Sequence, residues 1–243
     1  MIPHRGLALA LTFASVLSLP VAQAAAAQRV APIPPGTPLH RAWPVTPAVA
    51  CSLGVVGAPA LESALYPPDD VYYMLLKPST CGQCSLTALA NVHVTLVFPK
   101  PCAMRVAIGV VRAFGSTCLV PDVGQVLFGP VDTTLAASET DSTAYPVTQE
   151  FVIPVPSDWK LLGNAFASVA FPAVPDSCSA ADQPQLALRD GCAACVCYED
   201  FGGSIGDVCP GAAGLPLISA DVAECVVTPT RSQSWGSVKV HYR

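Results

Sequence analysis

The chain has 243 residues, of which 52% are apolar and 12% are charged, and its formal net charge is −5. Soluble proteins usually have about 25% charged residues, so much of this surface must consist of Ser, Thr, Gly, Pro and backbone groups. The apolar content excludes an intrinsically disordered chain. The acidic balance makes nucleic acid and anionic membrane surfaces poor partners.

Residues 1–24 have the pattern of a secretory signal peptide. His4 and Arg5 precede an apolar run from Leu7 to Leu19, and the small-residue sequence AQA follows at 22–24. The run is shorter than the roughly 18 apolar residues of a transmembrane helix, and no later stretch reaches that length, so no membrane span is predicted. We expect a mature chain that is secreted, periplasmic or at the cell surface. Scarce Asn and Lys would suit a GC-rich bacterial genome.

Removal of this leader takes away Arg5 and leaves 11 basic and 17 acidic residues, a net charge of −6. Residues 25–50 are rich in Ala and Pro and show no period of 2 or 3.6. This composition predicts a partly extended arm rather than a packed element.

Alternating apolar residues after the arm predict about ten strands. The longest, Leu86–Phe98, places Val92 and Val94 on one face and His93 on the other, where an ordinary solvated histidine is expected. The other runs are Val71–Leu76, Arg105–Ala113, Gln125–Phe128, Val147–Ile153, Ala165–Phe171, Gln185–Leu188, Leu215–Ser219, Val222–Val227 and Val238–Tyr242. With only one helical turn expected, at 157–163, the pattern predicts one antiparallel β-sandwich of jelly-roll type over residues 51–243.

Eleven cysteines in an exported chain indicate disulfide bonds. If Leu86–Phe98 and Arg105–Ala113 form a hairpin, Cys118 returns to the end where Cys81 and Cys84 lie. Cys102 then lies at the opposite end, far beyond the roughly 7 Å that a disulfide can bridge between Cα atoms. The hairpin therefore predicts a bond from Cys118 to Cys81 or Cys84, and none between Cys102 and Cys118.

A second group of cysteines should staple the loop-rich stretch 175–211. Its members are Cys178, Cys192, Cys195, Cys197 and Cys209, and Cys225 is a further disulfide candidate. The odd total leaves one thiol without an intramolecular partner, and Cys51, beside the arm, is the expected free cysteine. Alternatively, CGQC at 81–84 and CAAC at 192–195 could supply four thiolates to one zinc ion, or CGQC could be a redox pair. The oxidising compartment and the strand after CGQC favour disulfides.

Other motifs for chemistry are weaker. GGSIG at 202–206 matches G-x-S-x-G, with Ser204 as nucleophile and Asp221 and His241 downstream. That motif needs a strand before it and a helix after it, whereas IGDVCPGAAGLP cannot form a helix, so a Gly-rich turn is expected. Acidic residues at 199, 200 and 207 could line a calcium site, although their spacing matches no EF-hand-like loop. No catalytic, cofactor-binding or metal-binding residue is predicted.

Four features together resemble a group of Cys-rich secreted proteins from environmental bacteria. They are CGQC before a strand, a second cysteine pair past it, a late Cys-rich loop followed by GLPLISADVAEC, and the closing SWGSVKVHYR. The group has no established activity, so the resemblance implies export and an all-β fold and transfers no catalytic residue. We expect an exported, non-enzymatic structural or binding module at the cell exterior, with an extracellular protein or glycan as partner and no cofactor. The alternative is a secreted serine hydrolase that uses Ser204, or a Cys-ligated metal protein.

Overall fold

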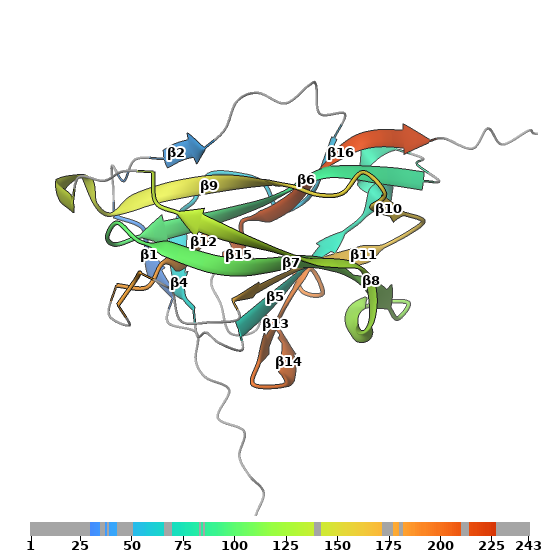
Figure 1. Cartoon of the computed structure of the whole chain (residues 1–243). Coiled ribbons are helices and arrows are strands. Elements are labelled where there is room, and N and C mark those ends of the chain that lie inside the picture. The colour runs from blue at the N-terminus through green and yellow to red at the C-terminus, as the bar shows by residue number, and fades with distance from the viewer. Residues whose placement is uncertain are drawn as a thin grey trace, which may run out of the picture.

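The protein is a two-sheet β-sandwich in the computed structural model (Figure 1). The structure describes residues 30–34, 37, 39–42, 51–65, 70–82, 84, 86–138, 142–171, 177–179, 182–209 and 214–226. Within these ranges the only helical elements are two 3-10 turns, η1 (Pro78–Cys81) and η2 (Ser142–Ala144), and no helix is long and apolar enough to cross a membrane. The predicted all-β sandwich is confirmed. The predicted signal peptide and the strand at Val238–Tyr242 lie outside the described residues.

Sheet A is built around one long central strand, β6. On one edge β6 pairs with β9 and β10, and on the other with β16 and β12. All pairs are antiparallel except that of β2 with β9. The strands of this sheet are β1 (Val30–Pro32), β2 (Leu39–Ala42), β3 (Cys51–Gly54), β4 (Leu61–Ala64), β6 (Leu86–Phe98), β9 (Val147–Pro154), β10 (Lys160–Leu161), β12 (Gln185–Asp190), β15 (Gly214–Pro216) and β16 (Ile218–Val226).

Sheet B is an antiparallel sheet with the order β14-β13-β5-β11-β7-β8. Its strands are β5 (Asp70–Leu76), β7 (Ala103–Phe114), β8 (Val120–Ala136), β11 (Ala165–Phe171), β13 (Cys197–Phe201) and β14 (Ser204–Asp207). Strand β8 forms one margin of the sheet and the β13–β14 hairpin forms the other.

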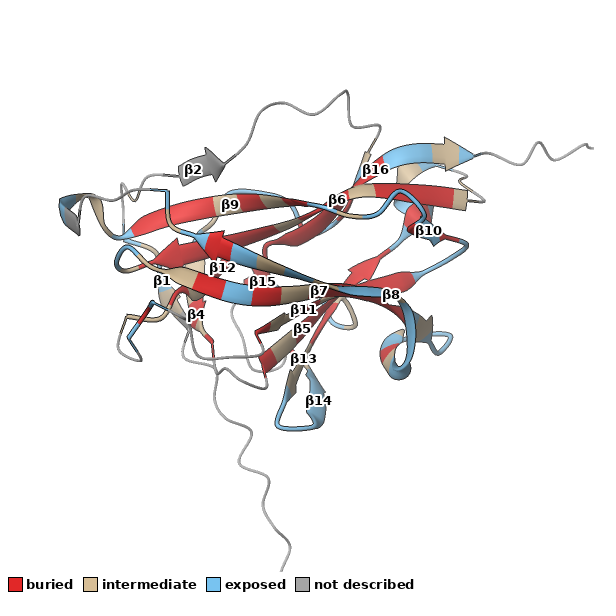
Figure 2. Ribbon diagram, viewed as in Figure 1, coloured by how far each residue is buried: buried red, intermediate tan, exposed pale blue. Residues whose placement is uncertain are grey.

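The main core lies between the two sheets, where the apolar faces of both meet (Figure 2). Val92 and Val94 of β6 and Met74 and Ile108 of sheet B are fully buried there. The period of 2 along each strand is the cause, because every second side chain points into the sandwich. The alternation in the sequence therefore located the core.

The predicted hairpin of β6 and β7 is wrong. β6 lies in sheet A and β7 in sheet B, and the chain crosses between the sheets at residues 99–102. Each of these strands has one strongly apolar face, so placing them in facing sheets buries both faces in the same core. Their backbone groups then pair with other strands, β6 with β9 and β16, and β7 with β8 and β11.

Three further elements differ from the expectation. β8 is much longer than the predicted Gln125–Phe128, because a margin strand with mostly exposed side chains lacks apolar alternation. The expected helical turn at 157–163 contains β10 instead, since Lys160 and Leu161 pair with β6. Within the arm, β1 pairs with β4 and β2 pairs with β9, so these short segments join sheet A.

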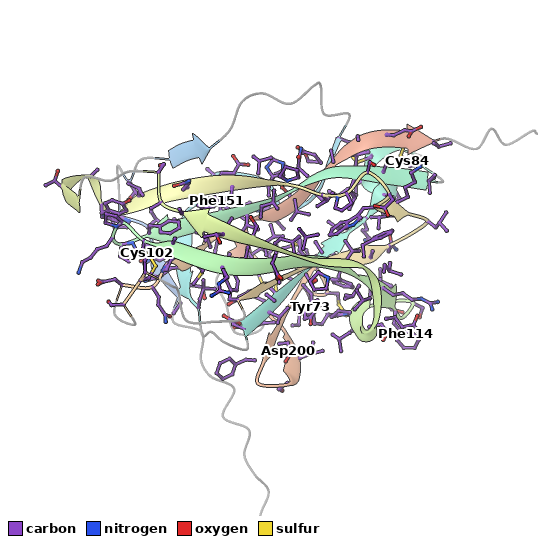
Figure 3. All side chains as sticks on the ribbon, in the orientation of Figure 1. Tyr73, Cys84, Cys102, Phe114, Phe151 and Asp200 are labelled. Atoms are coloured by element: carbon purple, nitrogen blue, oxygen red, sulfur yellow. A yellow bond between two sulfur atoms is a disulfide. The ribbon has the colours of Figure 1, made fainter. Side chains whose placement is uncertain are left out.

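Five disulfides connect the sandwich, and they correct most of the predicted pairings. They are Cys51–Cys81, Cys84–Cys225, Cys102–Cys178, Cys118–Cys195 and Cys192–Cys209. The prediction that Cys102 and Cys118 are not bonded to each other is confirmed, and the two cysteines lie at opposite ends of β7 and its connections. Figure 3 shows the bonded sulfurs, with Cys84 and Cys102 at opposite ends of the molecule.

The prediction that Cys51 is free is wrong, because Cys51 is bonded to Cys81 and the free cysteine is Cys197. Cys51 begins β3, against which η1 packs with Cys81 at its end. Cys197, on β13, is fully buried and belongs to the main core between the sheets.

The predicted bond from Cys118 to Cys81 or Cys84 is also wrong. With β7 in sheet B, Cys118 lies beside β13 and bonds to Cys195, while Cys84 stays with sheet A and bonds to Cys225. The group 178–209 is not self-contained either, since Cys178 bonds to Cys102. These errors follow from the wrong hairpin, because assigning a strand to the other sheet moves every cysteine attached to it.

Candidate functional site

Polar side chains line the face of sheet A that points away from the core. Asn91, His93 and Thr95 of β6 occupy one parity of the strand, and Ser219 and Asp221 of β16 are their cross-strand neighbours. All five are buried or half-buried. Polar groups at such positions need partners, because an unpaired buried group costs about 1–3 kcal/mol.

His93 lies at the centre of this face, between two carboxylates. Its Nδ1 is 3.0 Å from Oε1 of Glu150 on β9, and its Nε2 is 2.7 Å from Oδ2 of Asp221 on β16. Asp221 also accepts hydrogen bonds from Asn91 Nδ2 at 3.3 Å and from Ser52 Oγ at 3.1 Å. We call these five residues the polar ladder, which connects the adjacent strands β3, β16, β6 and β9.

On the other side of β9 the sheet continues with the parallel strand β2, in which Arg41 is the backbone register partner of Glu150.

The electrostatics of the ladder favour a protonated His93. Burial lowers the pKa of His93, but the hydrogen bonds to Glu150 and Asp221 and the charges of these carboxylates together raise it by more than burial lowers it. The pKa of His93 is therefore raised above its usual value. The imidazolium donates through both nitrogens. Because both nitrogens are engaged, neither is left to accept a proton from a bound molecule. The arrangement is suited to holding strands together.

The outer face of sheet B has a different character, since a second apolar cluster lies there. Its buried members are Tyr73, Leu75, Val111, Phe166 and Tyr198. The rings of Phe166 and Tyr198 meet edge to face with centroids 5.7 Å apart. Burial, with the charge of Asp200 as a second cause, raises the pKa of Tyr73 to about 12, so its phenol stays neutral at physiological pH. Figure 3 labels Tyr73 and Asp200 beside β5 and β13.

The connection between β7 and β8 is fastened over this cluster. Leu119 packs against it, and Cys118 is bonded to Cys195, which lies two residues before the start of β13. Cys118 Sγ is 3.1 Å from the hydroxyl oxygen of Tyr198. The disulfide therefore holds the end of the β7–β8 ribbon against the aromatic side chains.

The GGSIG segment forms a β-hairpin. Ser204 begins β14 and pairs with Phe201 at the end of β13, and Gly202 and Gly203, with φ of 61° and 84°, form the two-residue turn. The strand–turn–helix context of a nucleophile elbow is absent at 197–207. Asp221 belongs to the other sheet, and His241 lies outside the described residues. The structure does not bring Ser204 and Asp221 together.

The cysteines proposed as zinc ligands are bonded to four different partners. Cys81 and Cys84 bond to Cys51 and Cys225, and Cys192 and Cys195 bond to Cys209 and Cys118, so none of the four is a thiolate. The described part of the chain contains no group of three or more His, Cys, Asp or Glu residues that could hold a metal ion.

Of the three acidic residues suggested for calcium, Asp207 and Glu199 have structural partners, whereas the buried Oδ1 of Asp200 has no hydrogen-bond partner. Asp207 accepts hydrogen bonds from the backbone nitrogens of Cys195 at 2.7 Å and Cys209 at 2.9 Å. Glu199 accepts a hydrogen bond from the Tyr72 hydroxyl at 3.0 Å. Asp207 thus fixes the loops that carry two disulfides, and Glu199 links β13 to β5.

The polar ladder was not found from the sequence. The expectation of a solvated His93 is wrong, since its side chain is only 15% exposed and is hydrogen-bonded to two carboxylates. The available signal was the run of polar residues at 91, 93 and 95 on one parity of β6. Its partners come from residues 52, 150 and 221, and the sequence does not show that these strands are neighbours.

Comparisons with known proteins found no matching family model, no matching curated protein and no matching solved structure.

Proposed function

We propose that the protein is an exported, non-enzymatic module with a structural or binding role at the cell exterior. The observation that carries the proposal is the set of five disulfides, which use ten of the eleven cysteines. Such a set persists in oxidising compartments and is rare in the cytosol. Together with the signal-peptide pattern at residues 1–24, it favours a secreted, periplasmic or surface location.

The use of the reactive side chains supports the non-enzymatic part of the proposal. His93 is engaged through both ring nitrogens, Ser204 lies in a β-hairpin, and the thiol of Cys197 is buried. Burial raises the pKa of the Cys197 thiol well above its usual range, and the charges of Glu199 and Asp207 add to this effect. A neutral, enclosed thiol is a poor nucleophile.

Export and covalent state can be tested together. We expect the full chain, expressed with residues 1–24, to be recovered outside the cytoplasm with Ala25 as its first residue. Under denaturing conditions one cysteine should react with an alkylating reagent before reduction and eleven after it, because only Cys197 is free. Leu11→Arg, which interrupts the apolar run, should keep the chain inside the cell. Recovery in the cytoplasm with most thiols reactive would contradict the proposal.

The rival hydrolase is tested by labelling. An active-serine phosphonate should not label the oxidised protein. Labelling that disappears in Ser204→Ala and persists in Ser116→Ala, an exposed serine in the β7–β8 connection, would favour the hydrolase. A glycan array and a pull-down with exterior proteins would separate the two proposed classes of partner. The jelly-roll type of the sandwich stays a prediction from the sequence.

A further inference from the structure

A pocket of about 200 Å³ opens on the outer face of sheet A, where β6 ends and β9 begins (Figure 1). Val97 of β6, on the same parity as His93, is the cross-strand partner of Gln185 on β12, and Glu62 of β4 is the partner of Ala187. Residues two apart on a strand share a face, so Glu62, Gln185 and Val97 lie on the same side of the sheet. The lining consists of Pro34, Glu62, Val97, Pro99, Pro146 and Gln185.

The walls of the pocket are mostly apolar and are fixed by the backbone. Pro99 directly follows β6, and Pro146 directly precedes β9. Pro34 is held by a turn, in which N and Oγ1 of Thr37 donate hydrogen bonds to its carbonyl oxygen at 3.2 and 2.7 Å. Proline has no backbone N–H, so these three walls offer an anion no hydrogen-bond donor.

Glu62 supplies a half-buried carboxylate without a counter-charge. Burial raises the pKa of Glu62, and no hydrogen bond or charge from the described residues lowers it. Lys100, which follows Pro99 in the chain, is engaged elsewhere, because its Nζ lies 2.9 Å from Oδ1 of Asp182. A carboxylate that is partly removed from water and unpaired is unfavourable, so a cation beside Glu62 would be stabilising.

The chemistry of the lining favours an organic cation over a metal ion. Calcium takes about six to eight oxygen ligands, whereas the oxygen-bearing side chains of the lining are Glu62 and Gln185. A protonated primary amine has three N–H donors for these acceptors and an alkyl chain for the apolar walls. An apolar cavity of about 150 Å³ holds benzene, so this pocket has room for roughly six to eight non-hydrogen atoms.

We propose that the pocket binds a primary alkylammonium ion of about six non-hydrogen atoms. The ammonium group donates hydrogen bonds to the carboxylate of Glu62 and to the side-chain oxygen of Gln185. The alkyl chain packs against Val97 and between the prolines. This binding needs no export, so it stands apart from the role proposed above.

Three probes of equal length test the chemistry of the ligand. Pentylammonium, pentanol and pentanoate are titrated into the oxidised full chain at about pH 7, followed by amide chemical shifts. Pentylammonium should saturate a single site and shift the amides of Val97 and Gln185. Pentanol should bind at least about tenfold more weakly, and pentanoate should not saturate, because a charge-assisted hydrogen bond is lost or reversed. Equal affinity for pentylammonium and pentanol, or shifts centred on His93, would overturn the proposal.

A further probe separates two sources of the same ammonium group. Nα-acetyl-lysine methylamide carries it on a lysine side chain that is attached to a peptide backbone. Tighter binding of this probe than of pentylammonium would support the site as one for a lysine side chain of a partner protein. Tighter binding of pentylammonium would support it as a site for a free amine.

Substitution of Glu62 tests the proposal from the side of the protein. Glu62→Gln keeps the shape and removes the charge, so it should weaken pentylammonium binding at least about tenfold and leave pentanol binding unchanged. Glu62→Asp keeps the charge and should retain part of the affinity. Glu224→Gln, at an exposed position on β16, is the matched control and should bind like wild type. Unchanged affinity in Glu62→Gln would contradict the assigned role.

Urea denaturation separates binding from folding. Glu62→Gln should be at least as stable as wild type, because it removes a half-buried carboxylate that has no partner among the described residues. A loss of stability that accompanies the loss of binding would show that Glu62 holds the strands together, and it would overturn the proposal.

Discussion

The two outer faces of the sandwich are held by different forces. On sheet A the polar ladder joins strands through charged hydrogen bonds centred on His93. On sheet B the second apolar cluster, here called the aromatic cluster after its residues Phe166 and Tyr198, is covered by the β7–β8 connection. The Cys118–Cys195 disulfide fastens this connection to the loop before β13. One face therefore depends on protonation and the other on apolar burial and oxidation.

The largest effect is expected in the aromatic cluster. Phe166→Ala removes a fully buried ring and should lower the free energy of unfolding by about 3–5 kcal/mol, through lost burial and the cavity left behind. Leu162→Ala, at a side chain that is 85% exposed, should change it by less than about 0.5 kcal/mol. Urea denaturation of the oxidised proteins measures both values. A small effect at Phe166 would mean that the cluster contributes little to stability.

Removing the disulfide over that cluster should have the next largest effect. The double variant Cys118→Ser/Cys195→Ser should be less stable by about 2–4 kcal/mol, because the unfolded chain gains freedom. Limited proteolysis should cut the β7–β8 connection first. Cys192→Ser/Cys209→Ser, which opens a loop with a sequence separation of 17 rather than 77, should cost less. The reverse order would show that the ribbon does not need its disulfide.

A somewhat smaller loss is expected when the polar ladder is cut. Asp221→Ala leaves His93 and Asn91 without a shared acceptor and should cost about 1.5–3 kcal/mol, the range for hydrogen bonds to charged groups. Glu224→Ala, at an exposed position of the same strand, is the matched control and should be close to neutral. Chemical denaturation near pH 6 compares the two. Equal stability of both variants would show that the ladder is not a stabilising feature.

The smallest effect should come from pH. The folded-state pKa of His93 is raised above its unfolded value, so the ladder contributes its full stabilisation below about pH 6.5, as long as the carboxylates stay ionised, and loses it as the pH rises through the folded pKa. The wild type should therefore lose stability between pH 6 and pH 9. His93→Gln should lack that change. A wild-type protein that becomes more stable over this interval would contradict the assigned role of His93.

Local patterns in the sequence predicted a large part of the fold. The strands Leu86–Phe98 and Ala165–Phe171 have the predicted bounds, because the apolar alternation of each is regular. β8 was found only in part, since its side chains are mostly exposed and its pairing with β7 is irregular. The patterns of single strands could predict neither the polar ladder nor the apolar cluster on the outer face of sheet B. His93, Glu150 and Asp221 meet only when β6 lies between β9 and β16.

The sequence by itself determined the class of the fold, the alternating core positions and the expectation that most cysteines are bonded. Those properties depend on composition and on the period of a single strand. Only the tertiary structure decided that β6 and β7 belong to different sheets, and with that the partners of Cys51 and Cys118 and the burial of Cys197. The physical reason is that strand pairing and disulfide pairing depend on distances between segments far apart in the chain, and these distances are set by how the apolar faces pack together.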